Sequence, residues 1–337
     1  MAYTNQTTSS IADFISKLNT FLGANGWTTH HAPGSGEFAV EKNVSGALWV
    51  TMACQWDTGT PNRMGIYQWH GLTYNSGTSP WLQNLDSGSG AGSTTDATLA
   101  GERIVTLGSS GPSEFWCYED TNYFHVIIRR DTAKYEHFGA GLMDTYNDWV
   151  GGEYTYGQLV EKTSGSSSAI QADASYLLDG LAKDSGAITN MEQYCATVHI
   201  DGMDEQTAGM IWGVVLGDQG SGNLGTDTAA NARVHINGGY RAGLFPHLHG
   251  QFAGTIARGL VPMYPIVVSY WNRTNDDVYG PLGVMPDVRG VSIRNFTAAQ
   301  EITVGGDTWV VFPSYQSSTS SAAGFTNYQG IAYKQVS

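Results

Sequence analysis

The feature that most constrains the fold is a succession of short apolar runs, each bounded by residues that favour turns. Glycine alone contributes 43 residues, and clusters of Gly, Pro, Asn and Asp separate the runs. Runs of this kind occupy residues 37–42, 46–54, 63–69, 114–119 and 123–130. Short runs rich in aromatic and β-branched residues are typical of antiparallel sheets. The sequence therefore predicts an α+β protein that is predominantly antiparallel β, with sandwich-like sheets.

The window from 123 to 143 has the pattern of a β-hairpin and also holds two histidines. Its residues alternate between two faces around a turn at Asp131-Thr132: Phe124, Val126 and Ile128 share one face, and Tyr123, His125, Ile127 and Arg129 share the other. After the turn, Tyr135 and His137 face one way. We expect Arg129, Arg130, Lys134 and Glu136 to face solvent or to form cross-strand pairs worth at most about 1 kcal/mol each. The pattern favours a structural hairpin over general acid–base chemistry by His125 or His137.

The clearest helix lies near the N-terminus. Its apolar residues recur at helical spacing and are Ile11, Phe14, Ile15, Leu18, Phe21 and Leu22. Ser10 and Asp13 fit a capping box, and Asn25-Gly26 supplies a left-handed stop before Trp27. We expect one or two further short helices, one of them near residues 168–183, where apolar residues fall on one side: Ile170, Ala174, Leu177, Leu178 and Leu181.

The C-terminal hundred residues return to strand patterns. Gly305-Gly306 divides residues 301–312 into a predicted tight hairpin. Pro262 and Pro265 precede an apolar run, so we expect a strand to begin after Pro265. A polar segment near 160–168 suggests two domains, an N-terminal helix with a β-rich domain (1–160) and a β-rich C-terminal domain (161–337). The alternative is a single domain with a long insertion.

Composition excludes several classes of function. The formal net charge is -14 with only 16 Lys and Arg residues, so the clustered basic side chains of a nucleic-acid binder are missing. No apolar run is long enough to span a bilayer, and the N-terminal sequence lacks the pattern of a signal peptide. Cys54, Cys117 and Cys195 are far apart, which favours buried thiols over a disulfide framework or a zinc site.

Local motifs give no support for catalysis. His247 and His249 would share one face of a strand and so begin a metal site, but no further ligand lies nearby, and backbone hydrogen bonding is the favoured interpretation. The adjacent acid pairs suit turns or opposite strand faces better than a glycosidase site; they are Glu119-Asp120, Asp204-Glu205 and Asp276-Asp277. Phosphate-loop, zinc-protease and nucleophile-elbow motifs are absent. We therefore expect no catalytic residue, metal or cofactor.

Three segments together resemble a family of virion structural proteins of tailed bacteriophages. The first is the opening helix that ends in GANGWTTHH, and the second runs through YEHFGAG to GGEYTYG in residues 130–157. The third extends from YGPLGVMPDVRGV to the Gly-Gly hairpin and VFP, over residues 279–315. The matching residues are glycines, prolines and aromatics that shape turns and packing, so the resemblance implies no catalytic residues.

The resemblance implies a non-enzymatic, multi-copy subunit of a phage neck, collar, tail or baseplate, assembled in the host cytoplasm. Its partners would be copies of itself and other virion proteins. The alternative is a module that binds a receptor or host surface glycan through aromatic loops, with Trp69 and Trp81 as candidate residues and residues 160–245 as a further attachment surface. A polysaccharide depolymerase is the least favoured hypothesis.

Overall fold

The computed structural model describes the chain in segments. These are residues 2–30, 37–45, 48–57, 63–67, 103–107, 111–131, 134–146, 151–157, 159–160, 196–200, 210–211, 232–236, 263–272, 278–293, 296–313 and 329–335. Strands make up 69% of this part of the chain, and they form antiparallel sheets with one N-terminal helix. The predicted class, predominantly antiparallel β, is confirmed.

Sheet A is the central layer and has seven strands in the order β1-β7-β8-β9-β11-β13-β14. Its strands are β1 (Ala2–Thr7), β7 (Glu114–Asp120), β8 (Tyr123–Asp131), β9 (Lys134–Leu142), β11 (Gly151–Tyr156), β13 (Ala196–Ile200) and β14 (Met210–Ile211). Three consecutive strands, β7, β8 and β9, form its middle by hairpin pairing. Every residue from Tyr123 to Ile128 is buried, because both faces of the sheet are covered.

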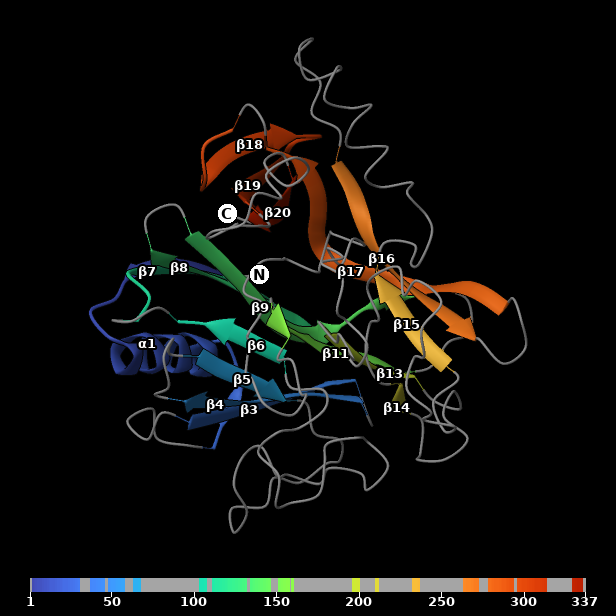
Figure 1. Cartoon of the computed structure of the whole chain (residues 1–337), viewed down its shortest axis with the longest axis horizontal. Helices are drawn as coiled ribbons and strands as arrows, with labels where there is room; N and C mark the ends of the chain where they lie inside the picture. Colours follow the sequence, from blue (N-terminus) through green and yellow to red (C-terminus); the bar gives the residue numbers. More distant parts are fainter. Residues whose placement is uncertain are drawn as a thin grey trace, which may run out of the picture.

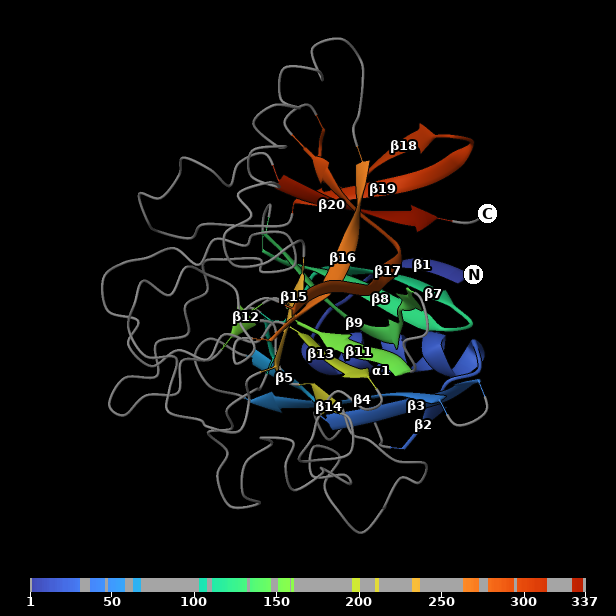
Figure 2. The same ribbon diagram turned by 90° about the vertical axis from the view of Figure 1, so that its right-hand side faces the viewer.

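Sheet B covers one face of sheet A with helix α1 (Ile11–Ala24) lying between them (Figures 1 and 2). Its strands follow the order β12-β6-β5-β4-β3-β2. Their bounds are β12 (Leu159–Val160), β6 (Arg103–Thr106), β5 (Arg63–Tyr67), β4 (Leu48–Asp57), β3 (Glu37–Ser45) and β2 (Thr28–Thr29). The apolar stripe of α1 packs in this core with Phe38 and Val40 from sheet B and Phe124 and Val126 from sheet A.

Sheet C covers the other face of sheet A, and its strands from β16 to β20 are drawn in orange and red in Figure 2. Its order is β15-β16-β17-β20-β19-β18, and β10 also pairs with β17. The strands are β15 (Ala232–Ile236), β16 (Met263–Asn272), β17 (Val278–Ser292), β20 (Gln329–Gln335), β19 (Asp307–Pro313), β18 (Gln300–Val304) and β10 (Asp144–Thr145). A second core, which includes Trp116, Ile127, Phe312 and Tyr333, fills the space between sheets A and C.

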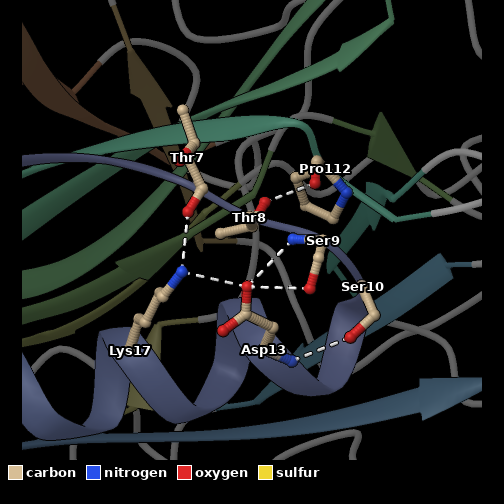
Figure 3. Close-up of polar contacts among 7 residues, drawn as sticks. All are labelled: Thr7, Thr8, Ser9, Ser10, Asp13, Lys17 and Pro112. Atoms are coloured by element: carbon tan, nitrogen blue, oxygen red, sulfur yellow. Dashed lines mark hydrogen bonds and ion pairs between the residues drawn. The ribbon is translucent and has the colours of Figure 1, made fainter.

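The ends of α1 match the predicted signals. Ser10 is the N-cap, and its Oγ accepts a hydrogen bond from the Asp13 backbone N–H at 3.1 Å. The Asp13 carboxylate accepts from the backbone N–H of Ser9 at 2.9 Å and from Lys17 Nζ at 3.0 Å (Figure 3). In a capping box the Asp13 carboxylate would accept from the backbone N–H of the N-cap residue, Ser10. Here it accepts from Ser9, one residue earlier. At the other end, Gly26 has the predicted positive φ, 86°.

The hairpin and the two-residue Gly-Gly turn are also confirmed. Strands β8 and β9 pair with Ile127 opposite His137, and β18 and β19 pair around Gly305 and Gly306. Arg130 and Glu136 form one of the expected cross-strand pairs, at 2.8 Å, and their side chains are only 9% and 5% exposed. The pair lies inside because other elements cover both faces of the hairpin.

Strand β16 begins earlier than predicted. It starts at Met263 and includes Pro265, whereas the sequence led us to expect a start after that proline. The register with β17 shifts between Pro265 and Val267. An irregularity of this kind tolerates a residue that has no N–H to donate, which explains how the strand passes through the proline.

Some predictions fall outside the described residues. The helix expected near 168–183 and all but the first residue of the domain boundary expected near 160–168 lie in the range 161–195, so both stay predictions. The turn residue Thr132 lies outside as well. In the described segments, no helix is long and apolar enough to cross a membrane.

Candidate functional site

Both histidines of the hairpin lie in the core between sheets A and C, with ring centroids 5.6 Å (His125) and 5.8 Å (His137) from that of Tyr333. His125 on β8 and His137 on β9 belong to the same face of sheet A, because the residue opposite His137 is Ile127, two positions after His125. Both side chains are buried, at 1% and 0% exposure. The structure therefore places both histidines of the window from 123 to 143 in one buried core.

Each histidine connects the two sheets through one of its ring nitrogens. His125 Nε2 lies 3.2 Å from the carbonyl oxygen of Pro286 on β17, and His137 Nε2 lies 2.8 Å from that of Pro313 on β19. A carbonyl oxygen only accepts hydrogen bonds, so both Nε2 atoms carry the proton and donate. The inter-sheet seam is our name for a group of six residues. It consists of the two histidines, the two prolines whose carbonyls they bind, and Tyr156 and Tyr333, whose hydroxyls meet the other ring nitrogens.

The other ring nitrogen of each histidine meets a tyrosine hydroxyl. His125 Nδ1 lies 2.8 Å from Tyr156 Oη of β11, and His137 Nδ1 lies 2.8 Å from Tyr333 Oη of β20. In a neutral imidazole with its proton on Nε2, Nδ1 accepts, so each tyrosine donates. All four ring nitrogens are thus engaged by protein groups.

Burial keeps both histidines neutral. It lowers the pKa of His125 to about 3 and that of His137 to about 4, since the charged imidazolium would lose its hydration, while the hydrogen bond to each proline carbonyl opposes this shift. Burial also raises the pKa of Tyr156 and of Tyr333. A buried neutral imidazole with both nitrogens engaged is suited to joining sheets, and this agrees with the structural interpretation of the hairpin.

Aromatic rings and one carboxylate extend the contacts of the seam. The Tyr333 ring stacks on Tyr118 with centroids 5.4 Å apart and on His137 at 5.8 Å. Tyr123 Oη donates to Asp287 Oδ2 at 2.7 Å, directly after Pro286 on β17. Asp287 has a positive φ of 51°, an uncommon backbone conformation outside glycine. The backbone at Pro286–Asp287 therefore presents a carbonyl and a carboxylate to sheet A at adjacent positions.

A second polar cluster joins sheets A and B at the end of α1. Trp27 Nε1 donates to Glu119 Oε1 at 3.0 Å, and Lys42 Nζ lies 2.8 Å from the same oxygen. The Lys42 ammonium also lies 5.2 Å from the centre of the Trp27 ring. Glu119, one member of a predicted acid pair, is therefore bound to structural partners in a buried cluster.

Other candidate residues cannot be compared with the structure. The pairs His247 and His249, Asp204 and Glu205, and Asp276 and Asp277 lie outside the described residues, as do Trp69, Trp81 and most of residues 160–245. The glycan-binding alternative therefore stays a prediction from sequence. Cys117 is buried, as predicted, and burial raises the pKa of its thiol. Within the segments that the structure describes, no three His, Cys, Asp or Glu side chains form a group suited to a metal ion.

Strand β1 provides a different kind of candidate, a sheet edge. Among the described strands it pairs with β7 alone and ends the order of sheet A. Its side chains carry no formal charge, and Asn5 and Thr7 are exposed. Sequence patterns missed this strand because residues 2–7 show no alternation of apolar and polar residues.

Comparison of the sequence with protein-family models gives no match, and comparison with curated proteins gives none either.

Proposed function

We propose that this chain is a non-enzymatic structural subunit of a tailed-phage virion that assembles in several copies in the neck, collar, tail or baseplate. The proposal starts from the resemblance of three segments to virion structural proteins. Its partners would be copies of itself and other virion proteins, and its location would be the particle, after assembly in the host cytoplasm.

The observation that carries the proposal is that the resembling segments contact one another in the fold. The second segment supplies His137, whose Nε2 donates to the carbonyl of Pro313 in the third segment at 2.8 Å. Asp144 and Thr145 of the second segment also pair with Val284 and Gly283 of the third, through strands β10 and β17. Residues far apart in the sequence thus form one structural unit, as expected if they preserve a common core rather than resemble the family by chance.

The first segment belongs to the neighbouring core. Trp27, at the end of GANGW, packs edge-on against Phe124 with ring centroids 4.8 Å apart and binds Glu119. Phe124 belongs to β8, the strand that also carries His125. The polar groups of these motifs are thus engaged in holding layers together, which suits a subunit that acts through its surface.

Quantitative mass spectrometry of purified virions tests the proposal. We expect the chain at a fixed copy number relative to the major capsid protein, in a multiple of three, five, six or twelve, as a symmetric ring or fibre attachment requires. Detection only in lysate of infected cells, with none in gradient-purified particles, would contradict it. A particle treated with high salt is the control that separates an integral subunit from an adsorbed protein.

A further inference from the structure

The hydrogen-bonding direction of every residue in β1 follows from the register of sheet A. A two-residue turn, Thr121-Asn122, joins β7 to β8, and such a turn closes on a hydrogen-bonded pair, here Asp120 and Tyr123. Even-numbered residues of β7 therefore point their N–H and C=O groups toward β8, and odd-numbered residues point toward β1. In the β1–β7 register, odd β7 residues face even β1 residues, such as Cys117 opposite Thr4.

The backbone groups of the odd residues in β1 consequently point away from the sheet. Two contacts agree with this assignment. The backbone N–H of Thr8, an even residue just after the strand, donates inward to Ser113 O at 3.0 Å. The carbonyl of Thr7, an odd residue, instead accepts from Lys17 Nζ of α1 at 2.8 Å, as Figure 3 shows.

Lys17 limits the open part of this edge. With the Thr7 carbonyl engaged, Tyr3 and Asn5 remain as the two residues between Ala2 and Thr7 whose N–H and C=O groups both point outward. Proteins commonly protect such edges with charged residues, prolines or bulges. Strand β18, at the edge of sheet C, carries Glu301, whereas β1 has no charge, no proline and an unbroken register with β7.

We propose that the β1 edge pairs antiparallel with the β1 edge of a second copy of this chain, about a two-fold axis at Thr4. This register places Tyr3 opposite Asn5 of the second copy and Asn5 opposite its Tyr3, so that each outward N–H faces a carbonyl. The edge is self-complementary in this one register, because its open residues lie symmetrically on either side of Thr4. Sheet A then continues from one copy into the other.

Charge favours a second copy as the occupant. The chain has a formal net charge of -14, so most surfaces of one copy repel the same surface of another. The six residues of β1 form an uncharged stretch on this acidic chain, and the two carboxylates opposite them in β7, Glu114 and Glu119, are paired with Arg129 at 3.0 Å and Lys42 at 2.8 Å. The Thr4 side chains of the two copies would also meet as a cross-strand threonine pair, a favourable combination in antiparallel sheets.

A disulfide trap tests this register in the purified chain. Thr4 would form a non-hydrogen-bonded pair across the axis, in which Cβ atoms approach closely enough for a disulfide. We expect the Thr4→Cys variant to become a covalent dimer under mild oxidation. The matched control is Asn5→Cys. In the proposed register the Asn5 residues of the two copies lie diagonally apart, so this variant should yield at least tenfold less dimer. Wild-type chain, which retains Cys54, Cys117 and Cys195, gives the background.

Adding Asn5→Pro to the Thr4→Cys variant provides the second arm. The Asn5 N–H points outward, so proline there removes an intermolecular donor and leaves the β1–β7 ladder intact. We expect the covalent dimer to disappear while the melting temperature stays close to that of Thr4→Cys alone. If proline unfolds the chain, Asn5→Lys gives the same test by placing one positive charge on each side of the axis.

Three outcomes would each overturn the proposal. They are equal dimer yields from Thr4→Cys and Asn5→Cys, no dimer from either variant, and an unchanged dimer yield when Asn5→Pro or Asn5→Lys is added to Thr4→Cys in a folded chain. The experiment does not depend on the proposed place of the chain in a virion. Its failure would leave the mass-spectrometry test untouched, and the reverse also holds.

Discussion

At the scale of single residues, the glycines of YEHFGAG make room for the tyrosines of GGEYTYG. Gly139 lies opposite Tyr156, and Gly141 lies opposite Tyr154, in the β9–β11 pairing. A Cβ atom at Gly139 would lie 2.4 Å from the carbonyl oxygen of Phe124 and 2.9 Å from the Tyr156 ring. The two motifs are therefore complementary parts of one packing arrangement, and the Tyr156 ring can lie beside His125 only because position 139 has no side chain.

Substitution of Gly139 by alanine should destabilise the protein. The nearest obstacle is a backbone atom, which cannot move without disturbing β8, so we expect a loss of about 1–3 kcal/mol or more in the free energy of unfolding. Gly23→Ala is the matched control, since a Cβ there meets nothing within 4 Å and position 23 is helical. It should stabilise by about 0.5–1 kcal/mol. Urea denaturation of both variants measures the difference, and changes of the same sign would contradict the packing argument.

At the scale of elements, the junction between β1 and α1 is held by side-chain contacts to backbone groups. Ser10 caps the first turn of the helix, Lys17 reaches back to the carbonyl of Thr7, and the Thr8 hydroxyl donates to the carbonyl of Pro112 (Figure 3). The helix is thereby fixed to the edge strand and to the segment before β7. The hydrogen bonds from Ser9 and from Lys17 lower the pKa of Asp13, because they stabilise its ionised form.

Ser10→Ala should weaken this junction. Loss of the N-cap acceptor leaves the Asp13 N–H without its partner, and we expect a decrease of about 1 kcal/mol in the free energy of unfolding. Ser16→Ala, at an exposed position within the same helix, should change it by less than about 0.5 kcal/mol. The comparison uses thermal or urea denaturation, and a cap variant as stable as the control would show that the cap contributes nothing.

The elements that sequence patterns predicted are those determined by residues close together in the chain. The alternation around His125 and the helical stripe of α1 are both set by nearest neighbours along the chain, so their faces were predicted correctly. The partners of the seam lie 31 residues away at Tyr156 and 196 residues away at Tyr333. No spacing rule connects such positions. Strand β1 was missed because it is stabilised by pairing with β7 rather than by its own composition.

At the scale of the whole molecule, sheet A is held on both faces by polar clusters within apolar cores. The seam joins it to sheet C, and the cluster of Trp27, Glu119 and Lys42 joins it to sheet B. Buried polar groups are expensive unless they are paired, so each cluster favours one alignment of the layers over any sliding of one sheet across another.

Acid should loosen the contact between sheets A and C. The pKa of each seam histidine is depressed in the folded protein from about 6.5 in the unfolded chain, to about 3 for His125 and about 4 for His137. At a pH between the folded and the unfolded pKa values, the unfolded chain binds more protons than the folded protein. The stabilising contribution of each histidine is therefore fully present above pH 6.5 and decreases as the pH falls. Linkage gives a combined loss of about 5 kcal/mol by pH 4.5.

Urea denaturation between pH 7 and 4.5 measures this loss. A variant that combines His137→Phe with Tyr333→Phe removes one of the two titrating groups together with its hydrogen-bond donor. We expect this variant to lose about half as much stability as the wild type over the same pH range, whatever its stability at pH 7. Parallel curves for the two proteins would assign the acid sensitivity to groups outside the seam.

The order of strands in sheet C has a consequence for synthesis on the ribosome. Strand β20 lies between β17 and β19, so these two strands are joined through a segment that is translated after both of them. While the nascent chain grows, β17 has no partner on that side until Gln329–Gln335 leaves the exit tunnel. The seam histidine His137 likewise lacks its partner Tyr333 until β20 has been translated. Sheet A can pair its central hairpins early, whereas the layer that covers it is completed late, and the exposed aromatic face of sheet A must remain soluble during that interval.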